Sequence, residues 1–134
     1  MIVIDSNIIF SCLLKDNPFF TFITSSTETF IIPKFAIVEL FKYKEKISKF
    51  SKLKEDEILE VFYTLLKKIN IYDETLISKN SYKKAYEIVK DIDEKDIVFI
   101  ALCIEFDAKL LTGDKKLIEG LKKKGYEKLI YEKF

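Results

Sequence analysis

Four acidic residues of the chain stand beside or inside apolar runs, where solubility does not require a charged side chain. Asp5 directly follows the run IVI, and Asp114 follows a short apolar segment and a glycine. Asp96 directly precedes the run IVFIALCI, and Glu39 lies inside the run FAIVELF. Carboxylates that are held close together repel one another and take up protons unless a cation compensates them. If the fold brings these four carboxylates close together, we expect a cation-binding site.

The rest of the composition limits which cation and which chemistry such a site serves. The chain has no histidine, and its two cysteines, Cys12 and Cys103, lie alone in apolar stretches rather than in a CxxC pair. The absence of histidine and of a paired-cysteine motif excludes zinc fingers, histidine-based acid–base catalysis and thioredoxin-like redox chemistry. With oxygen ligands alone, Mg²⁺ or Mn²⁺ fits better than zinc. Such ions activate water and neutralise charge on a scissile phosphate, so phosphoryl chemistry is expected.

Each acid also has a purely structural interpretation. Asp93 and Asp114 could cap helices, Asp96 could complement a helix dipole, and Asp5 could be a turn residue after a strand. The segment DIDEKD contains Asp91 and Asp93 as well as Asp96, so Asp93 could replace or join Asp96 in a site. The acids occur in this order along a chain in which strands and helices alternate. This joint pattern favours a functional site over four acids that each have only a structural role.

Five short apolar segments predict the strands that would position these acids. They lie at residues 2–4, 29–32, 69–72, 109–112 and 128–131. The first is a continuous β-branched run, which is typical of a strand buried on both faces of a parallel sheet. Asp5 and Asp114 follow the first and fourth strands, at the sheet edge where open α/β proteins place their chemistry. The alternation of strands and helices predicts an α/β sandwich.

Apolar spacing and end signals predict the helices between these strands. They lie at residues 8–13, from 18 onward, and at 35–50, 55–66, 81–89, 96–106 and 117–121. Asn17 and Ser81 are expected to cap the second and fifth of these helices, and Gly125 to end the last. The helix at 96–106 is apolar nearly all round, so we expect it in the centre of the molecule.

Length and charge indicate the broad class of the protein. With 134 residues, about half of them hydrophobic, residues 1–134 are expected to form one domain. The net charge is +1, which indicates neither a nucleic acid nor a membrane as partner. No N-terminal leader or membrane-spanning run is apparent, and the unpaired cysteines favour a reducing compartment. We therefore expect a cytoplasmic protein without membrane contact.

A lysine-rich stretch lies between positions 42 and 54. Glu45 is its only acid. A charge run of this kind is usually a solvated helix face. The alternative is a contact surface for a nucleic-acid backbone, for which the candidates are Lys42, Lys46 and Lys49.

The four acidic segments together resemble the acidic motifs of the PIN domain, the nuclease fold of VapC-type toxins and related ribonucleases. The matching segments are MIVIDSNIIF, FAIVELFK, DEKDIVFIALC and KLLTGDKKL, which contain Asp5, Glu39, Asp96 and Asp114. Local partners match as well, because Asn7 follows the first acid by two positions and Thr112 precedes the fourth by two. The resemblance covers residues 1 to about 120.

The resemblance implies a three-layer α/β/α sandwich with a central, mostly parallel sheet in the strand order 3-2-1-4-5. It also implies a Mg²⁺- or Mn²⁺-dependent endoribonuclease that leaves 5′-phosphate and 3′-hydroxyl ends. Asp5, Asp96 and Asp114 would ligate the metal, and Glu39 would complete the acidic quartet. Asn7 and Thr112 would support the cluster by hydrogen bonds. The family pattern favours Asp96 over Asp93, because Asp96 directly precedes the apolar helix.

Many small PIN proteins are toxins of type II toxin–antitoxin systems, which form homodimers and are neutralised by an antitoxin protein. The resemblance therefore implies an RNA substrate, an antitoxin partner and a homodimer. Two alternatives stay open at this point. One is a PIN nuclease that processes RNA without being a toxin, and the other is a non-catalytic PIN-like module that binds RNA or protein.

Overall fold

A five-stranded parallel sheet forms the centre of the fold. The structure is a computed structural model that describes residues 1–13 and 18–130, apart from the side chain of Lys44. The strands are β1 (Ile2–Ile4), β2 (Phe30–Pro33), β3 (Ile69–Tyr72), β4 (Lys109–Leu111) and β5 (Leu129–Ile130). Their spatial order is β3-β2-β1-β4-β5, and all four strand pairs are parallel. The predicted strand order is therefore confirmed.

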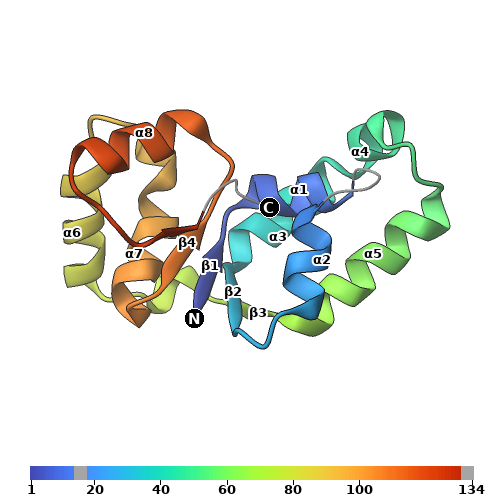
Figure 1. The fold of residues 1–134 in the computed structure, drawn as a ribbon, viewed down its shortest axis with the longest axis horizontal. Helices are drawn as coiled ribbons and strands as arrows, with labels where there is room; N and C mark the ends of the chain where they lie inside the picture. Colours follow the sequence, from blue (N-terminus) through green and yellow to red (C-terminus); the bar gives the residue numbers. More distant parts are fainter. Residues whose placement is uncertain (14–17, 131–134) are drawn as a thin grey trace.

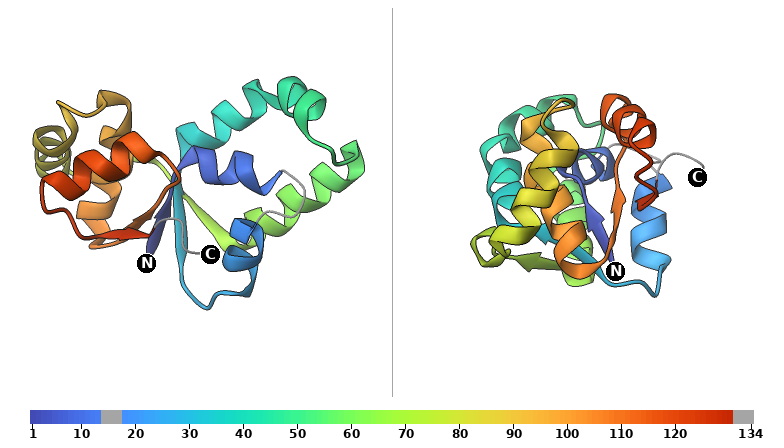
Figure 2. Two further views of the ribbon diagram at one scale, coloured as in Figure 1. Left: turned by 45° about the horizontal axis from the view of Figure 1, so that its top comes forward. Right: turned by 90° about the vertical axis from the view of Figure 1, so that its left-hand side faces the viewer.

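Helices cover both faces of this sheet. One group comprises α1 (Ser6–Cys12), α2 (Pro18–Ser25), α3 (Lys34–Lys42), α4 (Lys44–Phe50) and α5 (Glu55–Lys68). The other comprises α6 (Lys79–Val89), α7 (Ile97–Phe106) and α8 (Lys115–Lys123), with short 3₁₀ turns η1 (Glu74–Leu76) and η2 (Glu94–Asp96) before α6 and α7. The two groups lie on opposite sides of the sheet (Figures 1 and 2). This arrangement confirms the predicted α/β/α sandwich.

The core lies where β1 and α7 meet. All three residues of β1 are buried, as the β-branched run predicts for a central strand. Helix α7 packs against β1, β2 and β4 on one side and against α6 on the other. Its residues from Phe99 to Cys103 are all buried, which explains why its sequence has almost no polar face. Cys12 and Cys103 are both buried free thiols.

The order of the strands creates a switch point between β1 and β4. The chain leaves β1 toward β2 on one side, whereas β4 lies on the other side of β1 and continues to β5. Helices from the two layers therefore diverge beyond the carboxyl ends of β1 and β4, and open α/β proteins bind ligands in the crevice formed there. The backbone N–H of Asp5 donates to the Leu111 carbonyl oxygen at 3.1 Å, so β1 and β4 stay paired up to this crevice.

The predicted helix at 35–50 is wrong in one respect, because the structure divides it into α3 and α4. The backbone of Tyr43 departs from helical geometry between them, with φ −98° and ψ 11°. Its ring packs edge-on against Phe10 of α1, with ring centroids 6.4 Å apart. The apolar periodicity of residues 35–50 does not reveal this tertiary contact, so the break was not predicted.

Two predicted helix starts also differ from the structure. Ser78, not Ser81, caps α6, because the Ser78 Oγ accepts a hydrogen bond from the Ser81 backbone N–H at 3.2 Å. The Ser81 hydroxyl instead donates to the Glu105 carboxylate at 2.7 Å. Asp96 ends the η2 turn and does not lie in the first turn of α7.

Asn17, the expected cap of α2, and Tyr131, the expected end of β5, lie outside the described residues. Within the described ranges, no helix has the length and apolar character needed to cross a bilayer.

Candidate active site

Asp5 lies at the carboxyl end of β1, where the strand turns directly into α1. It is the N-cap of α1, and its Oδ1 accepts a hydrogen bond from the Asn7 backbone N–H at 3.0 Å. The side chain is nevertheless almost fully buried, with only 5% of its surface exposed. An N-cap alone does not require burial, so the cap explains the position of Asp5 but not its environment.

Thr112 connects the two acids that follow β1 and β4. Its hydroxyl donates to Oδ2 of Asp5 at 2.8 Å and accepts from the backbone N–H of Asp114 at 3.1 Å. Thr112 is fully buried. Asp114 in turn caps α8, because its Oδ1 accepts from the Leu117 backbone N–H at 3.2 Å. The hydroxyl thus holds one carboxylate directly and fixes the backbone of the other.

Asp96 enters the same region from the start of α7. It is buried, and its Oδ2 has no hydrogen-bond partner. Unlike Asp5, Asp93 and Asp114, it makes no capping hydrogen bond with its side chain. Asp93 caps the η2 turn through a 3.0 Å bond from the Lys95 backbone N–H. A buried carboxylate oxygen without a donor is costly, so Asp96 is the acid that capping explains least.

The pKa shifts indicate that these acids act on one another. Burial, together with the negative charges of Asp5, Asp93 and Asp114, raises the pKa of Asp96 to about 7. Burial also raises the pKa of Asp5, partly offset by its two hydrogen bonds, while the charge of Asp114 adds to the rise. The charges of three carboxylates, from β1, η2 and the β4–α8 connection, thus act on Asp96. We call these four residues the acidic cluster: Asp5, Asp93, Asp96 and Asp114.

Three other residues that the sequence analysis considered do not join the acidic cluster through their side chains: Glu39, Asn7 and Asp91. Glu39 is half-buried on α3, and it is not among the charges that raise the pKa of Asp5 or Asp96. Asn7 supports Asp5 through its backbone N–H, while its side chain is exposed. Asp91 is exposed and forms an ion pair with Lys124.

Ser6 is a further buried polar residue of this region. Its Oγ is buried without a hydrogen-bond partner. Within the described residues, Ser6 Oγ and Asp96 Oδ2 are the side-chain atoms in this condition, and Ser6 directly follows Asp5. Its position after a strand-ending acid was the only signal in the sequence.

The donor chemistry of the acidic cluster suits a hard divalent cation. All candidate ligands are carboxylate or hydroxyl oxygens, and Asp96 Oδ2 is buried without a donor. In residues 1–13 and 18–130, however, no three acidic or cysteine side chains are placed closely enough to share one metal ion. The residue types thus fit such an ion, and binding would require these side chains to reorient toward a common centre.

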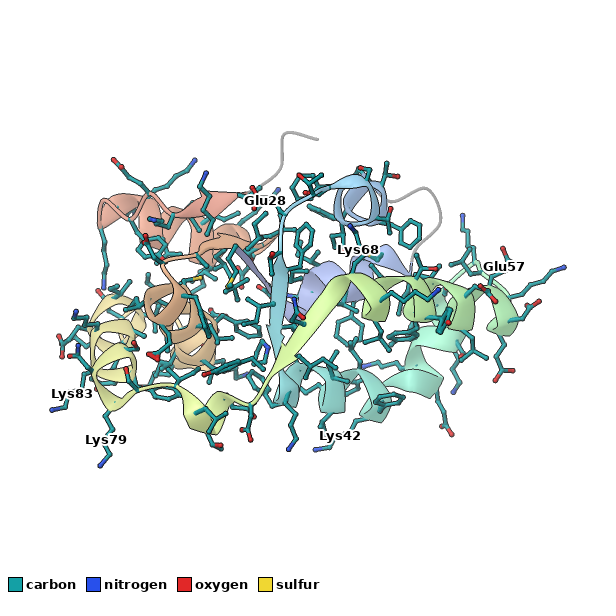
Figure 3. The ribbon with its side chains drawn as sticks, turned by 90° about the horizontal axis from the view of Figure 1, so that it is seen from below. Glu28, Lys42, Glu57, Lys68, Lys79 and Lys83 are labelled. Atoms are coloured by element: carbon teal, nitrogen blue, oxygen red, sulfur yellow. The ribbon has the colours of Figure 1, made fainter. Side chains whose placement is uncertain are left out.

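The three candidate RNA-contact lysines are exposed on α3 and α4. In the part of the chain that the structure describes, Lys42, Lys46 and Lys49 form no ion pair. Lys42 points away from the body of the molecule (Figure 3). Lys68 differs from them, because its Nζ donates to the Ser26 carbonyl oxygen at 2.8 Å.

Comparisons with known proteins identify the family. The PIN domain model matches residues 3–133. The chain also superimposes on a chain from the crystal structure of VapBC2 from Rickettsia felis bound to a DNA fragment from their promoter, with a TM-score of 0.65 and 20% identity over 98% of both chains. At this identity the likeness shows a shared fold. No curated protein matches the chain. Because the family model covers nearly all of the sequence, the chain belongs to the PIN-domain family, whose members are nucleases that generally use divalent metal ions.

Proposed function

We propose that this protein is a Mg²⁺- or Mn²⁺-dependent endoribonuclease that hydrolyses RNA phosphodiester bonds at the acidic cluster. The observation that carries the proposal is the unpartnered Oδ2 of Asp96, buried beside Asp5, Asp93 and Asp114. A cationic partner is needed when these acids ionise together at neutral pH. A divalent cation supplies that partner, and the position at the β1/β4 switch point is where open α/β folds bind ligands.

Asp5, Asp96 and Asp114 are the proposed metal ligands, with Asp93 as a further candidate. A bound divalent ion would activate water and neutralise charge on the scissile phosphate. Thr112 would hold Asp5 in place, because its hydroxyl already donates to Oδ2 at 2.8 Å. The Asn7 backbone N–H would do the same for Oδ1. By family resemblance Glu39 completes the acidic quartet, which requires its side chain to turn from α3 toward the cluster.

Unpaired positive charge on α3 and α4 supports RNA as the substrate. The exposed lysines of α3 and α4 would contact the phosphate backbone and release counterions when RNA binds. Reversing their charges should weaken RNA binding and lower the slope of log K against log salt. Unchanged affinity and slope would make this surface a solvated helix face. The three substitutions to combine are Lys42→Glu, Lys46→Glu and Lys49→Glu.

Within this proposal the protein acts as the toxin of a type II toxin–antitoxin pair in the cytoplasm. The similar fold in a VapBC2 complex supports an antitoxin protein as partner. Co-expression of the protein with the product of an adjacent small gene should relieve growth arrest and give a complex that co-purifies. Growth arrest that needs neither the acids nor an antitoxin would contradict the toxin assignment.

A homodimer is also part of the proposal, and exposed apolar side chains on α5 support it. Leu59, Tyr63 and Leu66 lie on one exposed stripe of this helix. The helix begins with the acids at 55–57 and carries Lys67 in its last turn, so two antiparallel copies would pair opposite charges around Tyr63. Light scattering should report a dimer for the native chain and a monomer for Tyr63→Asp.

RNA cleavage tests the nuclease activity. Single-stranded and structured RNAs should be cleaved with Mn²⁺ or Mg²⁺ and not with EDTA. Asp5→Asn and Asp96→Asn should lower the rate at least about 100-fold, since outer-shell partners of metal sites alone contribute about 10- to 100-fold. Asp91→Asn is the matched control, because Asp91 lies in the same segment but is paired with Lys124. Equal rates for Asp96→Asn and Asp91→Asn would contradict the proposal.

A further inference from the structure

A pocket lies between α1 and α4, next to the acidic cluster. Its volume is about 500 Å³, within the range of small-ligand sites in proteins. Asn7 lines its end toward the cluster, and the backbone N–H of the same residue donates to Asp5. At the other end, the Ser51 hydroxyl donates to the Leu13 carbonyl oxygen at 2.6 Å and ties α4 to α1. The pocket therefore extends along α1 from Asn7, which follows Asp5 by two positions.

Aromatic rings form much of the pocket wall. Phe10 of α1 and Tyr43, at the break between α3 and α4, pack edge-on with centroids 6.4 Å apart. Phe50, at the end of α4, also lines the pocket, yet 73% of its surface is exposed. An aromatic side chain this exposed beside a concave site leaves a ring face free for stacking.

Polar groups are placed along the same wall. The exposed side-chain amide of Asn7 offers both a donor and an acceptor, and the hydroxyls of Ser11 and Ser51 lie at the lining. Lys46 lines the pocket and is exposed without an ion pair among the described residues. Rings for stacking, an amide for a base edge and a cation for a phosphate are the features with which proteins recognise unpaired nucleotides.

We infer that this pocket is a subsite for one unpaired nucleobase of the RNA, stacked against Phe50 and Tyr43, with its phosphate beside Lys46. The inference rests on the proposed endoribonuclease function and adds a substrate class to it, namely RNA that is single-stranded next to the scissile bond. Paired bases cannot enter the pocket, because a duplex keeps their faces stacked. The free lysine charge favours a polyanion over an apolar peptide as the occupant.

Fluorescence of 2-aminopurine tests the subsite without cleavage. The probe is a single-stranded hexaribonucleotide with one central 2-aminopurine, titrated with the full chain in EDTA. Stacking should quench the probe in a saturable way. Phe50→Ala should weaken binding at least about fivefold, since base–aromatic stacking is worth about 1–3 kcal/mol per base. Tyr43→Phe should retain binding, whereas Tyr43→Ala should weaken it. Lys46→Ala should reduce the salt slope by about 1.

Phe41→Ala is the matched control for Phe50→Ala. Phe41 is similarly exposed, at 69%, but it does not line the pocket. Both side chains are largely in solvent, so both variants should fold, and circular dichroism verifies this. Equal affinities of Phe50→Ala and Phe41→Ala, or equal binding of the probe within a duplex, would overturn the inference. Loss of binding to a protein partner in Phe50→Ala, with RNA binding unchanged, would overturn it in favour of a peptide-binding groove.

Cleavage assays on the same variants separate the two proposals. Pocket-dependent probe binding without metal-dependent cleavage would reject the endoribonuclease function and leave the base subsite standing. Metal-dependent cleavage, with probe binding that is unchanged by substitutions of Phe50 and Tyr43, would support the endoribonuclease function and reject the base subsite.

Discussion

Replacing Asp96 with asparagine should make the metal-free protein more stable at pH 8 and leave its stability nearly unchanged at pH 4. The folded protein holds the pKa of Asp96 at about 7, above its usual value of 3.8, chiefly by burial and by neighbouring carboxylates. A raised pKa means that the folded state favours the protonated acid. This stabilisation is complete below about pH 4 and is lost as the pH rises through about 7. The asparagine side chain does not titrate between pH 4 and pH 8, so the variant does not lose this contribution to stability as the pH rises.

The size of the effect follows from this shift. One pKa unit corresponds to about 1.4 kcal/mol, so a rise from 3.8 to about 7 sets an upper limit of about 4 kcal/mol. Water reaches part of the carboxylate, which reduces the expected difference to about 1–2 kcal/mol. For a chain of this length that corresponds to about 4–8 °C in melting temperature. Other acids with shifted pKa values are common to both proteins and cancel in the difference.

Thermal unfolding in EDTA between pH 4 and pH 8 measures this difference. The melting temperature of Asp96→Asn minus that of the native chain should rise with pH and level off above pH 8. Saturating Mn²⁺ at pH 8 should reverse the order, because the metal stabilises the folded native chain and binds the variant less tightly. A difference that does not change between pH 4 and pH 8 would refute the assigned environment of Asp96.

Three further predictions concern residues around the site and the packing of α8. Thr112→Val removes the hydroxyl that donates to Asp5 and should cost about 1–3 kcal/mol in urea unfolding; an unchanged midpoint would contradict the role of this bond. Gly120→Ala should lower the melting temperature, because a Cβ there would lie 2.7 Å from Ile92, despite the better helix propensity of alanine. A higher melting temperature would show that Ile92 moves aside easily. Adding Mg²⁺ to the EDTA-treated native chain should raise its melting temperature at pH 8, and no shift at saturation would argue against a metal site.

Local sequence patterns predicted most of the fold because the strands are short and strongly apolar. The run at 2–4 predicted a central strand, and the all-round apolar character of residues 97–104 predicted a buried helix; both are confirmed. The break at Tyr43 depends on a contact with Phe10, more than 30 positions earlier, which helical periodicity does not contain. The cap of α6 was predicted at Ser81 and lies at Ser78; both are good capping residues, so capping preference alone does not distinguish them.

The candidate site was predictable only in part. Asp5 and Asp114 follow neighbouring parallel strands, so their proximity follows from strand order. The unpartnered oxygen of Asp96 does not follow from strand order, because it depends on how α7 packs against β1 and how η2 packs against α6 and α7. Glu39 lies inside an apolar run of the sequence, and the structure leaves it half-buried and not among the charges that raise the pKa of Asp5 or Asp96. Its role in catalysis stays a prediction.

Helix capping explains the acids of this cluster only in part. Asp5, Asp93 and Asp114 each accept one capping hydrogen bond, so capping accounts for one oxygen of each. It does not account for the burial of Asp5 or for the unpartnered oxygen of Asp96. In the proposed function, Asp5 and Asp114 would keep their capping bonds through one oxygen and turn the other toward the metal.

The most direct test of the metal site is the location of Mn²⁺ by anomalous scattering in crystals grown at saturating Mn²⁺. We expect a peak bonded to Asp96 Oδ2 and shared with Asp5 and Asp114, and we expect this peak to be absent from crystals of Asp96→Asn. A map without a peak at the acidic cluster, or a peak that persists in Asp96→Asn, would contradict the account.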